Sequence, residues 1–269
     1  MNIGIFDSGL GGLLVTSALI RQMPEYSYRY LGDTKHVPYG NRSHQTIREY
    51  TEEAIRYLVT EQQCSLIVVA CNTASAQALR EIQQDFLPST FPNVRVLGVI
   101  VPTVEAVCQL PITKVGLLAT QVTVNSEAYL HEIAKRRPEL QIVQQAAPLL
   151  VPIIEYEGIE WSEPILRHYL KPLLTENVEA VLLGCTHYAA IVDQIRPLLP
   201  EGTQLICQND IVPNSLSRYL ELHPDVAEQL DLTSQHRFLV TDLGEGYAEL
   251  AGRLYGDMVP LELVSYGNL

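Results

Sequence analysis

The chain has 269 residues, a length typical of one large domain or two small ones, and its 47% hydrophobic content is enough for a buried core. The net charge is −13 and the basic residues form no stripe, which argues against nucleic-acid binding through the phosphates. No apolar run reaches the length of a membrane span, and the N-terminus lacks the pattern of a signal peptide, so we expect no membrane association.

Short apolar runs alternate with amphipathic stretches of helical length along the chain. In chain order we expect a strand at 3–6, a helix at 13–22, a strand at 28–31, a helix at 45–61, a strand at 66–70, a helix at 74–86, strands at 94–100 and 115–119, helices at 126–137 and 163–175, a strand at 178–183, a helix at 189–198, a strand at 203–206 and a helix at 244–255. The strand at 66–70 is apolar throughout, which is typical of parallel sheets covered by helices on both faces.

The two halves of the chain resemble each other. The opening strand at 3–6 is similar to the strand at 115–119, and the strand that precedes Cys71 is similar to the strand that precedes Cys185. Positions 7 and 71 are 64 residues apart, and positions 119 and 185 are 66 residues apart. We therefore predict two pseudo-symmetric α/β domains with open parallel sheets that face each other across a cleft. Residues 1–96 and 209–269 would form one domain, and residues 97–208 the other.

Five cysteines occur at wide spacings, and none lies in a CxxC pair. An odd number at such spacings does not indicate a disulfide framework, and it fits reduced thiols in a cytoplasmic enzyme. Cys64, Cys108 and Cys207 are assigned to structure. Cys71 and Cys185 each follow an apolar strand, although a small buried residue is the ordinary role of a free cysteine.

Ligands of open α/β sheets lie outside the carboxyl ends of the strands. Asp7, Cys71, Thr120 and Cys185 fall there, each before an expected helix whose free N–H groups favour negative charge. We expect this setting to lower the pKa of both thiols and to hold a substrate carboxylate. Two thiols on opposite sides of a planar intermediate could invert a chiral centre, because one removes a proton while the other returns one.

The polar residues near these cysteines have two interpretations each. Asp7 is a helix cap or a carboxylate that handles a proton or orients a substrate ammonium group. His187 is a surface or capping residue, or it tunes the Cys185 thiol. Glu155 follows an apolar run, and by itself this position is typical of a solvated residue at the start of a helix. The remaining hydrogen-bonding residues suit either turns or substrate contacts, and these are Ser8, Tyr39, Gly40, Asn72, Thr73 and Thr186.

Four segments in combination resemble the glutamate racemase family. They are Gly4-Ile5-Phe6-Asp7-Ser8-Gly9-Leu10-Gly11-Gly12, Tyr30-Leu31-Gly32-Asp33-Thr34 through Val37-Pro38-Tyr39-Gly40, Ala70-Cys71-Asn72-Thr73-Ala74-Ser75 and Leu183-Gly184-Cys185-Thr186-His187-Tyr188. The Asp-Thr and Pro-Tyr-Gly loop favours glutamate racemase over the aspartate and hydantoin racemases. Weaker matches extend over nearly the whole chain.

The resemblance implies an isomerase that interconverts L- and D-glutamate without pyridoxal phosphate or metal, supplying D-glutamate for peptidoglycan and thereby for cell-wall biogenesis and cell shape. It implies that Cys71 acts on the D enantiomer and Cys185 on the L enantiomer, with auxiliary proton handling by Asp7, Glu155 and His187. It further implies a cytoplasmic homodimer. The implied substrate contacts are Asp7, Ser8, Tyr39, Gly40, Asn72, Thr73, Thr186 and His187.

Three segments depart from the family pattern, at Val101-Pro102-Thr103, at Ala146-Ala147 and at 208–215. Four other functions stay open at this point. An aspartate racemase would share the architecture, and a binding protein without activity would share the fold. A cysteine hydrolase would use Cys185 with His187 and leave Cys71 unexplained. A zinc site built from Cys71, Cys185 and His187 would have a ligand spacing that matches no structural zinc motif.

Overall fold

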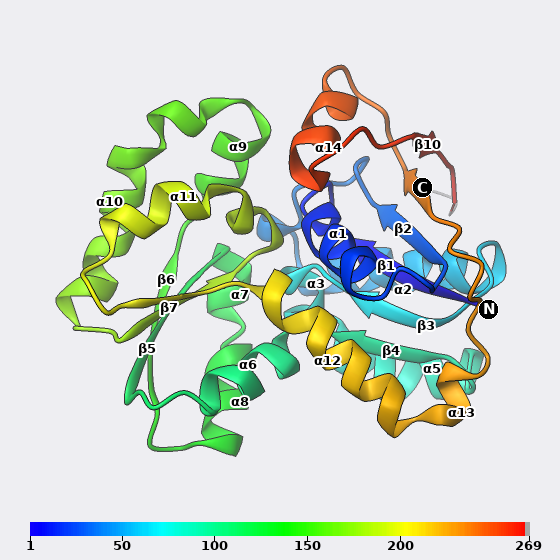
Figure 1. Ribbon diagram of the computed structural model, residues 1–269, viewed down its shortest axis with the longest axis horizontal. Coiled ribbons are helices and arrows are strands. Elements are labelled where there is room, and N and C mark those ends of the chain that lie inside the picture. The colour runs from blue at the N-terminus through cyan, green and yellow to red at the C-terminus, as the bar shows by residue number, and fades with distance from the viewer. Residues whose placement is uncertain (267–269) are drawn as a thin grey trace.

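The computed structural model describes residues 1–266 and contains two parallel sheets that lie side by side (Figure 1). The first sheet has six strands in the order β10-β9-β2-β1-β3-β4, and the second has four in the order β6-β5-β7-β8. The strands are β1 (Asn2–Asp7), β2 (Tyr28–Gly32), β3 (Cys64–Val69), β4 (Arg95–Gly98), β5 (Lys114–Ala119), β6 (Gln141–Ala146), β7 (Ala180–Gly184), β8 (Gln204–Ile206), β9 (Arg237–Val240) and β10 (Leu261–Leu263).

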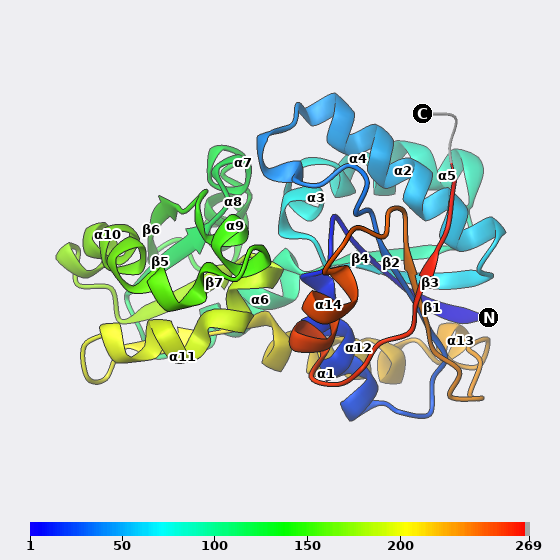
Figure 2. The ribbon, with the colours of Figure 1, turned by 90° about the horizontal axis from the view of Figure 1, so that it is seen from above.

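Helices cover both faces of the six-stranded sheet, with α2 on one side and α1, α12 and α14 on the other (Figure 2). The α-helices are α1 (Gly12–Gln22), α2 (His44–Thr60), α3 (Asn72–Gln77), α4 (Leu79–Glu81), α5 (Leu87–Thr90), α6 (Ile100–Cys108), α7 (Gln121–Asn125), α8 (Ala128–Arg136), α9 (Leu150–Glu155), α10 (Ser162–Thr175), α11 (Val192–Ile195), α12 (Gln208–Leu222), α13 (Pro224–Ala227) and α14 (Tyr247–Tyr255). The shorter helical turns are η1 (Tyr39–Asn41), the π-helix η2 (Ile82–Phe86), η3 (Gly158–Trp161), η4 (Thr186–Ile191) and η5 (Arg196–Leu198). Within residues 1–266, no helix is long and apolar enough to cross a membrane.

The central strand of each sheet is apolar because it is covered on both faces. Ile5 of β1 pairs with Tyr30 of β2 and Val68 of β3, and Leu117 of β5 pairs with Leu182 of β7. One continuous cluster of buried apolar side chains includes residues of both sheets and of the helices between them. The two sheets therefore share a core, and their relative placement is set by packing as well as by the connecting chain.

The expected α/β fold with two parallel sheets is confirmed, and β1–β5, β7 and β8 lie close to the predicted strands, whereas β6, β9 and β10 are not predicted from the sequence. The predicted strand at 94–100 is too long, because β4 ends at Gly98 and α6 begins at Ile100. The predicted helix at 74–86 is a chain of shorter pieces with a π-helical turn. The predicted helix at 189–198 is divided into 3₁₀ and α turns in the same way.

The division into two domains stays a prediction, and the sheet composition supports it. Strands β1–β4, β9 and β10 form the six-stranded sheet, and β5–β8 form the four-stranded sheet. Helix α12 begins at Gln208, directly after the last strand of the second sheet, and packs along α1 of the first. The chain thus returns to the first sheet through one long helix (Figure 1).

Candidate active site

The carboxyl ends of β1 and β3 bring Asp7, Ser8 and Cys71 together, because the two strands are parallel neighbours. Asp7 is completely buried and accepts hydrogen bonds from the Gly9 N–H at 3.1 Å and from the Thr186 hydroxyl at 3.3 Å. Burial raises the pKa of Asp7, while the charge of His187 and these hydrogen bonds oppose the increase. Asp7 is therefore a buried carboxyl that can take up a proton more readily than a surface carboxylate.

Cys71 is 5% exposed and occupies the N-cap position of α3, where the Ala74 N–H lies 3.4 Å from its Sγ. The thiol donates to the Ser8 hydroxyl at 3.3 Å. Burial, followed by the nearby Asp7, raises the pKa of Cys71 to about 12, although the hydrogen bonds to Ser8 and Ala74 act in the other direction. The expectation of a lowered pKa for this thiol is wrong, because the increase caused by burial is larger than the decrease caused by the N–H groups at the start of α3.

The carboxyl end of β7 places Cys185 in contact with His187 and, through it, with Glu155. Cys185 is 8% exposed, and its Sγ lies 4.0 Å from Nδ1 of His187. Nε2 of His187 donates to Oε1 of Glu155 at 2.9 Å. Burial by itself would lower the pKa of His187, but Cys185 and Glu155 together raise it well above its usual value. The thiol, imidazole and carboxylate thus form a chain along which a proton can move.

The two halves of the site meet at several side chains. The Thr186 hydroxyl reaches Asp7 from the second sheet, and Thr73 Oγ1 of α3 lies 3.0 Å from Thr120 Oγ1 at the start of α7. The charge of Cys185 also contributes to the raised pKa of Cys71, which places the two thiols within electrostatic reach. A side chain at Gly11 would overlap the His187 ring, so only glycine allows this close approach.

The loop after β2 is fixed beside this region. The Val37–Pro38 peptide bond is cis, and Tyr39 is buried with its hydroxyl donating to Asp33 Oδ2 at 2.6 Å. Burial and the neighbouring Asp33 raise the pKa of Tyr39 well above its usual value. Gly40 packs against Thr120 of the second half. The Tyr39 hydroxyl is therefore already used by Asp33, and this hydrogen bond helps to hold the loop in place.

Sequence reasoning missed a group of buried polar residues behind Cys71. Asn72 exchanges two hydrogen bonds with Gln208, and Tyr129 and Thr103 also contact this pair. Asn72 is a predicted site residue, but Tyr129, Thr103 and Gln208 belong to no motif. Thr103 and Gln208 lie in segments that depart from the family pattern, and Tyr129 has no sequence signal of this kind.

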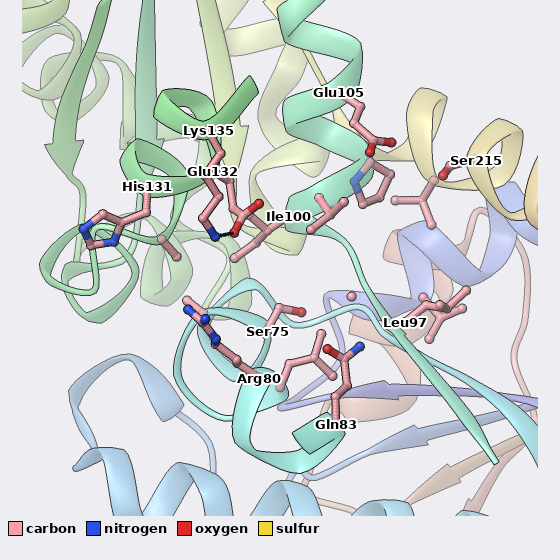
Figure 3. Close-up of a pocket in the computed structure, with 18 of the residues that line it drawn as sticks. Ser75, Arg80, Gln83, Leu97, Ile100, Glu105, His131, Glu132, Lys135 and Ser215 are labelled. Atoms are coloured by element: carbon pink, nitrogen blue, oxygen red, sulfur yellow. Dashed lines mark hydrogen bonds and ion pairs between the residues drawn. The ribbon is translucent and has the colours of Figure 1, made fainter. Parts of the chain in front are cut away.

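A cavity of about 1110 Å³ lies between the two halves (Figure 3). Arg80 and Gln83 reach it from the first half, and His131 and Lys135 reach it from α8. Neither Cys71 nor Cys185 lines this space. Among residues 1–266, no cluster of three or more His, Cys, Asp or Glu side chains could hold a metal ion.

The protein is an α/β protein with two parallel sheets. Each sheet places one buried cysteine, Cys71 or Cys185, at the carboxyl end of a strand, so each half of the fold supplies one half of the site. The sequence model of the family Asp/Glu/Hydantoin racemase matches residues 8–213, and the chain belongs to this family of amino-acid racemases. It is 33% identical to the glutamate racemase of Synechocystis sp. over 98% of this chain and 91% of that one.

Solved structures show the same relationship. The glutamate racemase of Francisella tularensis, determined in complex with D-glutamate, superposes with a TM-score of 0.87 at 30% identity, covering 98% of this chain and 97% of that chain. An aspartate racemase homologue from Pyrococcus horikoshii has a TM-score of 0.56 at 17% identity, covering 82% of this chain and 99% of that chain. The second likeness shows the fold alone, so the comparisons favour the glutamate branch.

Proposed function

We propose that the protein interconverts L- and D-glutamate, with Cys71 and Cys185 as the two proton-transfer groups. The observation that carries the proposal is the pair of buried thiols at matched strand ends, each with its own proton partner. Cys71 lies beside Asp7 and Ser8, and Cys185 lies beside His187. The similarity to glutamate racemases supports the choice of substrate.

The proposed protonation states of the two thiols suit conversion of L-glutamate to D-glutamate. Cys71 keeps its proton in the resting protein because burial raises its pKa. Cys185, as a thiolate paired with protonated His187, removes the Cα proton of L-glutamate and leaves a planar carbanion. The Cys71 thiol then donates its proton to the opposite face, which gives D-glutamate, a Cys71 thiolate and a Cys185 thiol. In the reverse direction the Cys71 thiolate is the base, and Asp7 is placed to accept a proton from this thiol.

The Cα proton is far less acidic than either thiol, so the site must lower the barrier by orientation and by excluding water. Both cysteines are nearly inaccessible, and the polar side chains around them are held by hydrogen bonds. The remaining proposed substrate contacts are Ser8, Tyr39, Gly40, Asn72, Thr73, Thr186 and His187. Since the Tyr39 hydroxyl is bound by Asp33, we propose that this loop contributes shape and backbone groups.

The first test replaces each thiol separately. Cys71→Ser and Cys185→Ser remove one base each, and we expect either variant to lose racemisation almost completely, by about 1,000-fold or more, because a hydroxyl is a much weaker acid. Exchange of the Cα proton in D₂O, followed by NMR with each pure enantiomer, measures the effect. Cys64→Ser, a change at a buried cysteine outside the site, is the control. Unchanged racemisation in either of the first two variants refutes the two-thiol assignment.

Two alternatives can be separated by assay. An aspartate racemase would turn over aspartate faster than glutamate, and one methylene group is worth a factor of about 10 to 200 in a fitted pocket. The chain from Cys185 through His187 to Glu155 also resembles the arrangement of a cysteine hydrolase. Family membership and the second thiol at Cys71 favour the racemase.

The resemblance also supports a cellular role. We propose that the D-glutamate serves peptidoglycan synthesis, and with it cell shape, in the cytoplasm, and that the protein acts as a homodimer without a cofactor. Depletion of the protein in its host should then stop growth unless D-glutamate is supplied. Light scattering of the purified protein measures the subunit number.

A further inference from the structure

A network of four buried polar side chains lies directly behind Cys71, and the proposed proton transfers do not use it. It consists of Asn72 at the start of α3, Thr103 of α6, Tyr129 of α8 and Gln208 at the start of α12. All four are at most 3% exposed. Asn72 directly follows Cys71, so a single peptide bond connects the network to the proposed catalytic cysteine.

The hydrogen bonds of the network fix the orientation of the Asn72 amide. Nδ2 of Asn72 donates to Oε1 of Gln208 at 2.7 Å, and Nε2 of Gln208 donates back to Oδ1 of Asn72 at 2.9 Å. The Tyr129 hydroxyl donates to the same Oδ1 at 2.6 Å. Rotating the Asn72 amide alone would place its oxygen against that of Gln208, so one arrangement is strongly preferred.

The two hydroxyl groups have complementary roles. Thr103 donates its proton to the Val99 carbonyl at 2.6 Å, so its oxygen is left to accept from Nε2 of Gln208 at 3.3 Å. The Tyr129 oxygen accepts from the same nitrogen at 3.0 Å while its proton goes to Asn72. The two N–H groups of Gln208 Nε2 face three oxygens, so the longest contact, to Thr103, shares a proton with another, and this connected buried network favours one geometry.

The elements that supply the network come from both halves of the fold. Asn72 follows β3 of the six-stranded sheet, Tyr129 lies on α8 beyond β5, and Gln208 follows β8 of the four-stranded sheet. Helix α6 packs against α8 and α12, and its Thr103 accepts a hydrogen bond from Gln208 of α12. The network therefore links the segment that carries Cys71 to the half of the molecule that carries Cys185.

We infer that Gln208 is a positioning residue that holds Cys71 at a fixed place relative to Cys185 through Asn72. The inference rests on the proposed racemase function. A buried amide contributes little net stability compared with an apolar side chain of similar size, so a network of this kind serves geometry more than stability. Transfer to opposite faces of one carbon depends on the separation of the thiols, and a misplacement of about 1 Å can cost about 100-fold in rate.

The test compares Gln208→Leu with Gln62→Leu. Gln62 is another buried glutamine, but it bonds Tyr57 and Arg237 at the opposite end of β3 from Cys71. We expect Gln208→Leu to lower kcat about 10- to 100-fold in both directions with a smaller change in KM. Gln62→Leu should leave kcat within about twofold of the wild type, whatever its effect on stability. Equal kcat in wild type and Gln208→Leu overturns the inference while leaving the racemase function intact.

A second measurement needs no substrate and remains informative if the protein does not racemise glutamate. Alkylation of Cys71 by iodoacetamide, followed by peptide mass spectrometry, should become several-fold faster in Gln208→Leu because the freed start of α3 opens more often. Cys64 in the same molecule should not change. Tyr129→Phe removes only one hydroxyl and should shift kcat and Cys71 alkylation in the same direction by less. Unchanged Cys71 alkylation in both variants overturns the positioning role independently of activity.

Discussion

At the scale of single residues, the two thiols of the site have different surroundings. Cys71 has a carboxyl and a hydroxyl beside it, and burial keeps its proton bound. Cys185 has an imidazole beside it, whose own pKa is raised through Cys185 and Glu155. The proposed two-sided transfer needs one proton donor and one proton acceptor, and the different surroundings of the two thiols suit these two roles.

The variant Glu155→Gln tests the series of contacts from the Cys185 thiol through His187 to the Glu155 carboxylate. The thiolate of Cys185 needs a protonated His187, so activity should fall as pH rises through the raised pKa of His187. Removing the Glu155 charge lowers that pKa, and the alkaline limb of kcat/KM should move to lower pH. The shift must be equal for L- and D-glutamate, because the equilibrium constant between enantiomers is one.

The control for this variant is Glu157→Gln, which removes a neighbouring carboxylate that pairs with Arg253 at the surface. It should leave the pH profile of kcat/KM unchanged. An alkaline limb that stays in place in Glu155→Gln would show that His187 does not support the thiolate in this way.

At the scale of elements, the N-terminus of α1 must approach η4 closely. A Cβ at Gly11 would overlap the His187 ring and lie 2.6 Å from Thr186 Oγ1. The backbone of Gly11 has φ −59, so a side chain there is compatible with the local conformation. The requirement for glycine therefore comes from contact between the two halves of the site.

Gly11→Ala should abolish most racemase activity while the protein remains folded. The added methyl group pushes His187 away and prevents the arrangement around Cys185, which we expect to cost about 100-fold in kcat/KM. Gly252→Ala is the matched control. It lies inside α14 with no atom closer than 3.6 Å to the new Cβ, and it should raise the free energy of unfolding by about 0.5–1 kcal/mol. Wild-type activity in Gly11→Ala would contradict the close approach.

Several strands with apolar runs could be predicted from the sequence, whereas β6 and the short β9 could not. Strand β3 is buried throughout and was predicted, whereas β6 is a half-buried edge strand with three glutamines and was missed. Helix α12 was missed because Pro213 interrupts its pattern. The cysteines could be located by the internal repeat, but Gln208 could not, because the partners of a buried amide depend on tertiary contacts.

At the scale of the whole molecule, the two sheets hold both thiols in a closed interior. Polar contacts that join the halves around the site include those of Thr186 with Asp7 and of Thr73 with Thr120. An exposed ion pair at 2.8 Å also connects Arg253 of α14 to Glu157 beyond α9. Because both thiols are nearly inaccessible, we expect the halves to separate around the cysteines when a substrate enters.

Thiol alkylation can detect this separation because the chain contains a matched pair of cysteines. Cys64 and Cys71 lie at opposite ends of β3, both are buried, and burial raises the pKa of each to about 12. Cys64 belongs to the interior of one sheet, whereas Cys71 lies between the halves. Opening of the halves exposes Cys71, but only unfolding of the sheet exposes Cys64.

We therefore expect iodoacetamide to modify Cys71 at least about tenfold faster than Cys64 under native conditions, since local opening costs less free energy than global unfolding. Glutamate should slow the modification of Cys71 and Cys185 and leave half-buried Cys108 unaffected, because only the first two lie in the proposed cleft. Peptide mass spectrometry over time measures all four rates in one sample. If Cys71 reacts as slowly as Cys64 and glutamate has no effect, the halves do not open in this way and substrate must enter by another route.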